Sequence, residues 1–373
     1  MILTIFKKML YILIGLVALF LLIGFLFISF SPQFGKSASK EQKAEYQKLA
    51  YYKDGKFVNL IKSEMNIEFF KLMGQYINPV PNKSPAANIE VLKIDSLEIV
   101  ENRSQDQITW FGHSAFLLEL DSKKILLDPM FGNSPAPHPW LGPKRYSKEL
   151  PIEIEKIPFI DYVLFSHDHY DHLDYGSVML LKEKVGAFYV PLGLGNHLES
   201  WGVDKSKIHE LAWWDEIKVG DIQLACTPAR HFSGRGLFDR ESTLWCSWVI
   251  KSDVSAVYFS GDGGYGPHFK EIGEKYGPFD LSLMECGQYN EQWQAIHMLP
   301  EETVQAAMDV NSKRFMPIHW GAFTLSLHAW TEPVERAGVK AEELSMSMST
   351  PRIGEVMTLD SVSVDYKKWW LSL

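Results

Sequence analysis

The chain has 373 residues, of which 46% are hydrophobic and 22% are charged, so its composition is that of a folded protein with a sizeable core. Its formal net charge is −9 and its isoelectric point is about 5.8. This balance argues against a nucleic-acid partner, because surfaces that bind nucleic acids are basic. The three cysteines form no disulfide framework, although one bond between Cys226 and Cys246 is compatible with neighbouring strands.

A nearly charge-free apolar segment runs from Met9 to about Phe30, directly after a pair of lysines. A run of this length matches the ~30 Å hydrocarbon core of a bilayer, whereas the apolar part of a cleaved signal peptide has only ~7–15 residues. We therefore expect residues 1–32 to form an uncleaved signal-anchor helix, with cleavage near residues 37–39 as the alternative.

The lysines before this segment predict that the N-terminal end stays in the cytoplasm. The remainder of the chain would then lie across the membrane, which in a Gram-negative bacterium is the periplasm. Three lysines between residues 36 and 43 act against this orientation.

Residues 33–90 are expected to form a connecting region with short helices and no catalytic chemistry. Ser39 and Gln42 have the spacing of a capping box, which predicts a short polar helix through Leu49. A second, amphipathic helix is expected from Ile61 to Tyr76.

Residues 91–373 read as one large domain in which short apolar strands come first and strands alternate with helices later. Two β-rich halves, each with helices outside, predict an αββα sandwich of the α+β class. The expected strands and helices cover residues 108–111, 115–120, 124–128, 175–183, 186–190, 217–219, 222–227, 244–250, 256–260, 300–310 and 315–318.

A dense cluster of histidines and carboxylates, with the pattern H-x-H-x-D-H, follows the apolar run of residues 159–165. Its members are His167, His169, Asp171 and His172. Neutral imidazole is the commonest side-chain metal ligand, and imidazole with carboxylate suits Zn, Fe or Mn better than Ca or Mg. Because the cluster comes directly after a predicted buried strand, it lies where open sheets present ligand sites.

Three further residues also end apolar runs, namely His231, Asp262 and His319. Glycines on either side of Asp262 allow the backbone to turn sharply there. Together with the histidine cluster, these residues give five His and two Asp, which is enough for two four- or five-coordinate metals that share a bridge.

The histidine cluster resembles the metal-binding signature of the metallo-β-lactamase superfamily. A closer resemblance, from about Trp110 to Glu343, is to N-acylphosphatidylethanolamine-hydrolysing phospholipases D. The sequence departs from that family at Met284-Glu285-Cys286, where an acidic residue enters beside Gly287. The segments that carry the resemblance are 142–146, 163–174, 213–214, 244–248, 277–280 and 318–321.

The resemblance implies two divalent metal ions, of which Zn²⁺ is the expected kind. His167, His169 and His231 would bind the first metal, Asp171, His172 and His319 would bind the second, and Asp262 would bridge both. The same resemblance places Asp128 behind a ligating histidine as its hydrogen-bond acceptor; the alternative is an Asp that starts a turn before Pro129.

The implied reaction is attack of a metal-bridging hydroxide on the phosphorus of an N-acylated phospholipid, which releases phosphatidic acid and an N-acylethanolamine. The expected partners are therefore phospholipid and the membrane, with no nucleic acid and no specified oligomeric state. A metal-dependent lactonase or small phosphodiester hydrolase is one alternative. A non-catalytic, membrane-tethered protein that binds metal or lipid is another.

Three more residues are expected to position the phosphate or protonate the leaving group, namely His113, Tyr289 and His297. The alternatives are a capping or core role for His297 and a packing role for Tyr289. His328 resembles a family site position more weakly, and the remaining histidines are expected on the surface or in loops: His138, His197, His209 and His268.

Overall fold

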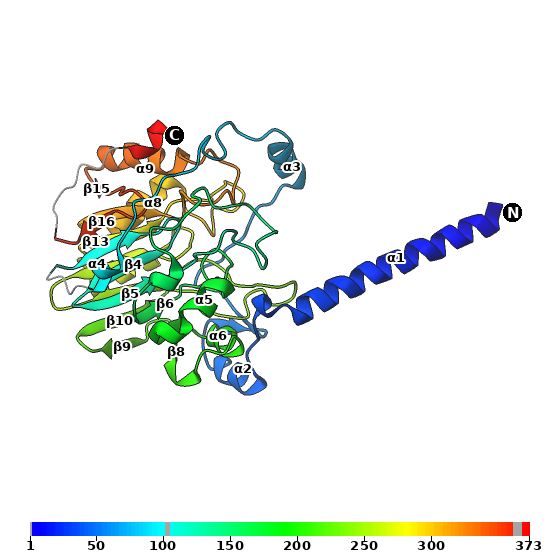
Figure 1. The fold of residues 1–373 in the computed structure, drawn as a ribbon, viewed down its shortest axis with the longest axis horizontal. Coiled ribbons are helices and arrows are strands. Elements are labelled where there is room, and N and C mark those ends of the chain that lie inside the picture. Colours follow the sequence, from blue (N-terminus) through cyan, green and yellow to red (C-terminus); the bar gives the residue numbers. More distant parts are fainter. Residues whose placement is uncertain (1, 101–104, 361–367) are drawn as a thin grey trace.

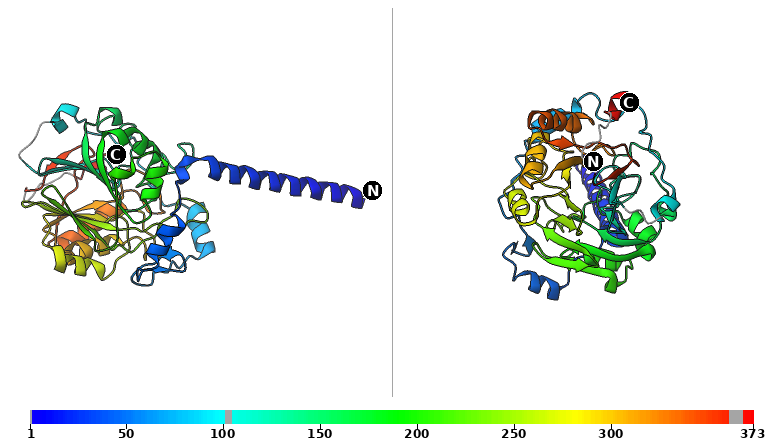
Figure 2. Two further views of the ribbon diagram at one scale, coloured as in Figure 1. Left: turned by 90° about the horizontal axis from the view of Figure 1, so that it is seen from below. Right: turned by 90° about the vertical axis from the view of Figure 1, so that its left-hand side faces the viewer.

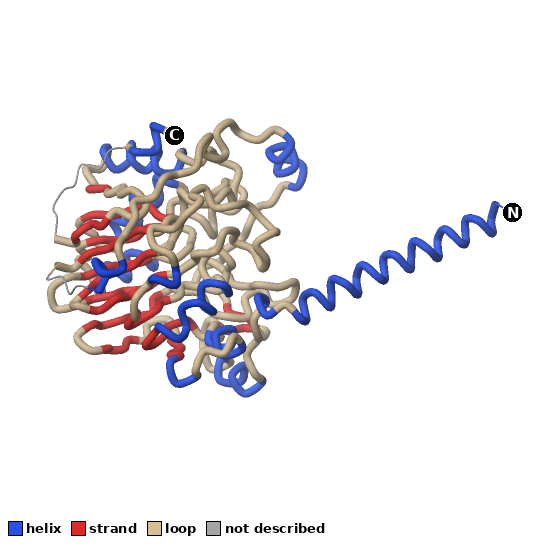
Figure 3. Tube along the Cα trace, viewed as in Figure 1, coloured by secondary structure: helices blue, strands red, loops and turns tan. Residues whose placement is uncertain are grey.

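The computed structural model describes residues 2–100, 105–360 and 368–373, in which two seven-stranded sheets face each other (Figures 1 and 3). The first sheet has the order β16 (Val356–Thr358), β3 (Gln107–Trp110), β4 (Phe116–Leu120), β5 (Lys123–Leu127), β6 (Ile160–Leu164), β7 (Val185–Pro191) and β8 (Ile208–Leu211). The second has the order β15 (Ser347–Met348), β14 (Arg314–Ile318), β13 (Leu281–Glu285), β12 (Ala256–Phe259), β11 (Ser247–Lys251), β10 (Ile222–Thr227) and β9 (Glu216–Val219).

Each sheet is apolar on both faces, which explains the continuous apolar runs in its strands. In β4, Phe116 and Leu118 point into the core between the sheets, whereas Leu117 belongs to a separate core on the outer face. In β12, Val257 lies in the core between the sheets and Tyr258 lies in the outer core of the second sheet. Since side chains alternate along a strand, a sheet buried on both sides needs apolar residues at successive positions.

The two outer cores are covered by helices, which completes the predicted αββα sandwich. The first sheet is covered by α5 (Tyr175–Leu181) and α6 (Gly195–Ser200), through residues such as Val178 and Leu198. The second is covered by α7 (His268–Tyr276), α8 (Pro300–Asp309) and α9 (Glu332–Glu343). A further short helix is α4 (Ser96–Val100).

Helix α1 (Ile2–Phe30) projects from the body of the protein (Figures 1 and 2). Its segment Thr4–Phe30 is 27 residues long, none of the most apolar stretch is buried, and by length and composition it can cross a membrane. The chain then enters a single turn of 3₁₀ helix, Pro32–Phe34, which packs against the body.

The connecting region contributes to the central core. Helix α2 (Lys40–Tyr46) begins at the expected capping box, because Gln42 N donates to Ser39 Oγ and Ser39 N donates to Gln42 Oε1. The hairpin of β1 (Tyr52–Lys53) and β2 (Lys56–Phe57) follows. Phe57 is fully buried and packs with the residues between the two sheets.

The helix expected over residues 61–76 is only partly present, because α3 covers Phe69–Ile77. The residues before it are not helical, and two of them form hydrogen bonds to another segment. Asn66 N donates to the carbonyl of Gln292 over 2.8 Å, and Glu68 N donates to the side-chain oxygen of Gln292, also over 2.8 Å. These tertiary bonds replace the intrahelical bonds that the sequence pattern predicted. The three cysteines are buried and free, so the Cys226–Cys246 bond is not formed.

We expect Phe57→Ala to lower the free energy of unfolding by about 3–5 kcal/mol, because it empties a fully buried site in the central core. Denaturant unfolding of the full chain in detergent micelles measures this change. Leu60→Ala is the matched control, since Leu60 is 54% exposed and its loss should change stability by less than about 0.5 kcal/mol. Equal effects of the two substitutions would show that the connecting region is only a linker.

Candidate metal centre

The predicted ligands converge at one edge of the sandwich, where strands from both sheets end. The cluster of residues 167–172 follows β6 of the first sheet. His231, Asp262 and His319 follow β10, β12 and β14 of the second sheet, respectively. Figure 3 shows loops on the side of the body next to α1 and strands on the opposite side. The sandwich thus brings together residues that are up to 152 positions apart along the chain.

Three imidazoles form the first group of donor atoms. His167 Nε2 lies 2.9 Å from His169 Nδ1, and His231 Nε2 lies 3.2 Å from the same atom. Burial lowers the pKa of each of these three side chains, and the neighbouring histidines lower the pKa of His167 and His231 further. The rings are therefore neutral at physiological pH, which is the form of imidazole that binds a metal.

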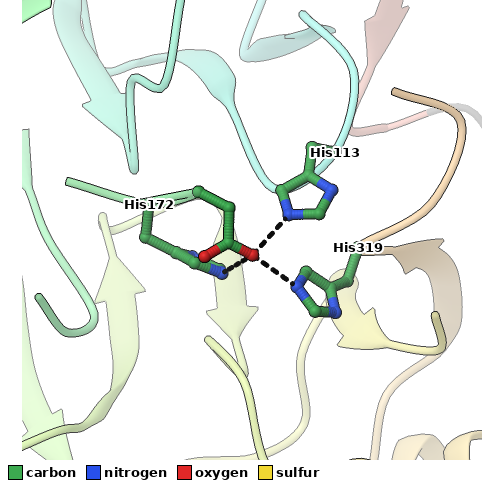
Figure 4. Close-up of side chains that lie close together, drawn as sticks. His113, His172 and His319 are labelled. Carbon is green, nitrogen blue, oxygen red and sulfur yellow. Dashed lines mark hydrogen bonds and ion pairs between the residues drawn. The ribbon is translucent and has the colours of Figure 1, made fainter. Parts of the chain in front are cut away.

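The second group consists of Asp171, His172 and His319, with His113 beside it. Figure 4 shows the three imidazoles of His113, His172 and His319 pointing toward one carboxylate oxygen. This oxygen is Asp171 Oδ2, which lies 2.9 Å from His113 Nε2, 3.1 Å from His319 Nε2 and 3.5 Å from His172 Nε2. The four side chains offer ligand atoms that all lie within 4.8 Å of one another.

Asp262 lies between the two groups. Its Oδ2 atom is 3.1 Å from Nε2 of both His172 and His319, and 3.9 Å from Nε2 of both His167 and His231. Burial opposes ionisation of Asp262, but the nearby imidazoles outweigh it and hold its pKa well below the usual range. One carboxylate oxygen therefore faces all four rings as an anion.

The donor set fits divalent metal ions. Asp262 Oδ1 is buried and has no hydrogen-bond partner among the described residues. Buried polar atoms without a partner are costly, and a bound metal satisfies them. Burial opposes a charge on His172 and His319, yet the surrounding carboxylates outweigh it and raise the pKa of both, that of His319 to about 10. The carboxylates at the site thus favour positive charge, which bound metal ions can supply.

Asp128 supports the second group from behind, as expected. It accepts a hydrogen bond of 2.6 Å from His172 Nδ1 and two from Ser166, of 2.7 Å from the backbone N and 2.5 Å from Oγ. A carboxylate behind an imidazole fixes the orientation of the ring, so Nε2 is the nitrogen of His172 that faces the centre.

Glu285 is a supporting carboxylate that the sequence analysis interpreted only as a departure from the family. It is fully buried, and its Oε1 lies 3.4 Å from His319 Nδ1 and 3.3 Å from His297 Nδ1. Its other oxygen accepts from Met298 N over 2.9 Å. Glu285 therefore orients two imidazoles at once. An acidic residue at the end of a buried strand was the signal for this role.

His197 was expected on the surface or in a loop but is buried within α6, and it links the segment after α1 to the cluster of residues 167–172. Lys36 N donates to His197 Nδ1 over 2.9 Å, so the ring proton is on Nε2, which donates to Asp168 Oδ2 over 3.3 Å. Asp168, between two predicted ligands, also accepts from Gly234 N and Thr243 Oγ1. A Cβ on Gly35 would lie 2.0 Å from His197 Nδ1, so only glycine allows this approach.

The other candidates lie in different surroundings. His297 stacks on His319, with ring centroids 5.2 Å apart, and its side chain is 14% exposed, so it lines the partly exposed side of the centre. His113 is fully buried behind Asp171. Tyr289 is not brought into the cluster, because its hydroxyl donates to Glu332 over 2.6 Å and accepts from Arg336. His328 stacks on Tyr289, and His268 is buried rather than exposed.

Comparison with known proteins identifies the family of this chain. Residues 123–320, more than half of the chain, match the beta-lactamase superfamily domain. The chain therefore belongs to the beta-lactamase superfamily, whose fold is shared with metal-dependent hydrolases. This confirms the resemblance and the fold expected from the sequence.

Among curated proteins, an uncharacterized protein of Mycobacterium tuberculosis is 39% identical over 317 residues, which cover 82% of this chain and 83% of that protein. N-acyl-phosphatidylethanolamine-hydrolyzing phospholipase D 1 of Caenorhabditis elegans is 34% identical over 229 residues, which cover 58% of this chain and 64% of that protein. Among solved structures, the metallo hydrolase Igni18 of Ignicoccus hospitalis has a TM-score of 0.52 at 22% identity, covering 71% of this chain and all of that one.

The hydrogen bond from Lys36 N predicts that Lys36→Pro weakens the metal centre. Proline has no N–H, so the buried His197 Nδ1 loses its donor, which should cost about 1–3 kcal/mol of stability. We expect a lower melting temperature and faster loss of metal to a chelator. Lys36→Ala keeps the N–H and is the matched control. If both variants retain metal equally well, this bond does not support the cluster.

Proposed function

We propose that this chain is a membrane-anchored, dinuclear-metal phosphodiesterase that hydrolyses N-acylphosphatidylethanolamine-like lipids to phosphatidic acid and N-acylethanolamine. The observation that carries the proposal is the position of Asp262 Oδ2 between the two groups of imidazoles, within 3.9 Å of four ring nitrogens. The similarity to a phospholipase D that acts on this lipid class supports the choice of substrate.

In this proposal, His167, His169 and His231 hold one metal, Asp171, His172 and His319 hold the other, and Asp262 is shared. Histidine-rich sites with a few carboxylates favour Zn²⁺ among the common divalent cations. When bound, such a pair of ions lowers the pKa of water and stabilises negative charge on phosphate oxygens.

His297 is the proposed proton donor to the leaving group. Glu285 lies at its Nδ1 atom, so Nε2 is the ring nitrogen that remains for substrate, and the ring stands on the partly exposed side of the centre. In the reaction, a water oxygen forms a bond to phosphorus and the bond from phosphorus to the ethanolamine oxygen breaks. The leaving oxygen takes a proton, which a histidine at this position can provide.

His113 is better suited to positioning than to proton transfer. It is fully buried, and burial lowers its pKa to about 3, so the ring is neutral. Its Nε2 lies 2.9 Å from Asp171 Oδ2, and it thereby fixes the orientation of this proposed ligand.

We also propose that α1 spans a bilayer with the loop-rich edge of the sandwich on the far side from the cytoplasm, in the periplasm of a Gram-negative cell. The apolar length of Thr4–Phe30 and the lysines before it support this arrangement. A lipid substrate and the metal centre would then share one membrane surface.

A substrate panel on protein of known metal content tests the proposal. We expect two zinc ions per chain and release of N-acylethanolamine from N-acylphosphatidylethanolamine. Hydrolysis of lactones or small phosphodiesters without lipid turnover would instead support the alternative hydrolases. Bound zinc without any turnover would support a non-catalytic binding protein and contradict the proposal.

Asp262→Asn should abolish turnover and reduce the metal content toward one ion per chain, because the amide removes the anion that both groups face. The expected loss of kcat is at least about 10³-fold, given that both nucleophile formation and charge stabilisation depend on the metals. Kinetics combined with elemental analysis measure both effects. The control is Asp253→Asn in the exposed turn between β11 and β12, which should change neither.

Glu285→Gln should lower kcat about 10- to 100-fold with little change in KM, because the carboxylate orients His319 and His297 but does not touch the lipid. The pH profile of kcat should change as well, since the proposed proton donor loses its anionic neighbour. Glu285→Asp should recover part of the activity. A variant with normal kcat and an unchanged pH profile would show that Glu285 only fills the core.

A further inference from the structure

Helix α3 (Phe69–Ile77) exposes its apolar face, whereas a helix that packs on a protein core buries it. With 3.6 residues per turn, Phe69, Phe70, Met73, Tyr76 and Ile77 fall on one side of the helix. All five are exposed, and Phe70 is 88% exposed. No residue of this helix is buried. An apolar face turned to solvent is unfavourable unless another surface covers it.

The polar side of α3 is the side attached to the protein. Lys71 pairs with Glu291 over 3.5 Å, and Gln75 Oε1 accepts a hydrogen bond of 3.3 Å from Gln292. Gln292 also holds the two residues that lead into the helix, Asn66 and Glu68. The helix is thus fixed by its polar face, and its apolar face points away from the body.

Helix α3 stands on the same side of the protein as the proposed membrane span. Both α1 and α3 leave the body on this side in Figure 1, and the turned view in Figure 2 agrees. Figure 3 shows that the loop-rich edge, which carries the metal centre, also faces this side. The segment before α3 bonds to the centre directly, because Asn59 exchanges hydrogen bonds with the backbone of His231.

Two more exposed apolar groups lie close to the end of α1. Trp140 is 70% exposed, and its ring lies 6.1 Å from that of Phe27 in the last turns of α1. Phe238 is 97% exposed, and it lies three residues after Arg235, whose Nε donates to the carbonyl of Gln33 over 2.8 Å. Tryptophan beside the end of a membrane span is typical of the interfacial zone.

We infer that the exposed face of α3, together with Trp140 and the loop around Phe238, is a second membrane contact that rests on the bilayer spanned by α1. This inference rests on the membrane span in the proposed function and adds the surface by which the metal centre meets lipid. Amphipathic helices of this kind lie in the plane of the interface with their apolar side about 5–10 Å deep. The occupant is the lipid surface, because the chain's own span fixes a bilayer on this side.

The experiment uses the full chain reconstituted in phosphatidylcholine–phosphatidylglycerol vesicles, with an environment-sensitive fluorophore on Phe70→Cys. The native cysteines are buried, so the introduced thiol is the one that reacts. The control is Val254→Cys, which is 87% exposed in the turn between β11 and β12 and lies at the opposite ends of the strands from the metal ligands.

We expect nitroxide-labelled lipid to quench the label at position 70 at least about threefold more than the label at 254, as for an interfacial helix. Aqueous iodide should show the reverse order. Equal quenching at both positions would overturn the inference. So would rapid disulfide formation between two copies at Phe70→Cys without quenching by lipid, which would identify a second copy as the occupant.

A measurement of lipid turnover distinguishes a failure of this inference from a failure of the proposed function. Phe69→Ser combined with Phe70→Ser and Ile77→Ser changes only exposed side chains, so folding should be preserved. Turnover of N-acylphosphatidylethanolamine in vesicles should fall about tenfold while turnover of the same lipid in detergent micelles is unchanged. If the parent chain hydrolyses no lipid, the proposed function fails, and the quenching result still decides whether α3 contacts the bilayer.

Discussion

The structure depends on one carboxylate oxygen, Asp262 Oδ2, which faces four imidazole rings within 3.9 Å. This arrangement requires the ends of β6 and β12, which belong to different sheets, to meet at one edge. The contact is close, since a Cβ on the preceding Gly261 would lie 2.7 Å from the Cβ of Ser166. The packing of the two sheets and the glycine at position 261 therefore together determine where the predicted ligands lie.

Three residues at the same edge have a left-handed backbone conformation. His113, Asp128 and His319 all have positive φ, of 56°, 38° and 66°. Such conformations cost of order 1–3 kcal/mol each for residues other than glycine, and they persist only where neighbouring structure enforces them. Here His319 N donates to His113 O, and His113 N donates to Trp320 O, so two strained residues hold each other in place. Burial in the core offsets the conformational free energy that these three residues cost.

The sequence predicted the sandwich and its convergent ligands because both depend on local order. An apolar run followed by His or Asp predicts that a strand ends at that residue. Strand ends from the two sheets then lie at a common edge, where ligands bind. The capping box at Ser39 was likewise readable, since both of its hydrogen bonds lie within four residues. These features need no knowledge of distant contacts.

The features that the sequence did not reveal all depend on distant partners. Residues 61–68 have a helical pattern but are not helical, and Asn66 and Glu68 instead bond to Gln292, more than 220 positions away. His197 was predicted to be a surface or loop histidine, but its two ring nitrogens form hydrogen bonds with Lys36 and Asp168. Tyr289 reads as a site residue, yet Glu332 and Arg336 engage its hydroxyl. None of these pairs produces a recognisable pattern in the amino-acid sequence.

The docking of residues 32–36 has a consequence for how the protein stands in the cell. Trp201 Nε1 donates to Pro32 O over 2.6 Å, and Arg235 and His197 form hydrogen bonds with Gln33 and Lys36, so several bonds attach the segment after α1 to the body. A globular domain on a loose tether samples every tilt relative to its anchor. If α1 spans a bilayer as proposed, this attachment limits the tilt of the domain, and its encounters would be governed by lateral diffusion and by the surface density of what it meets.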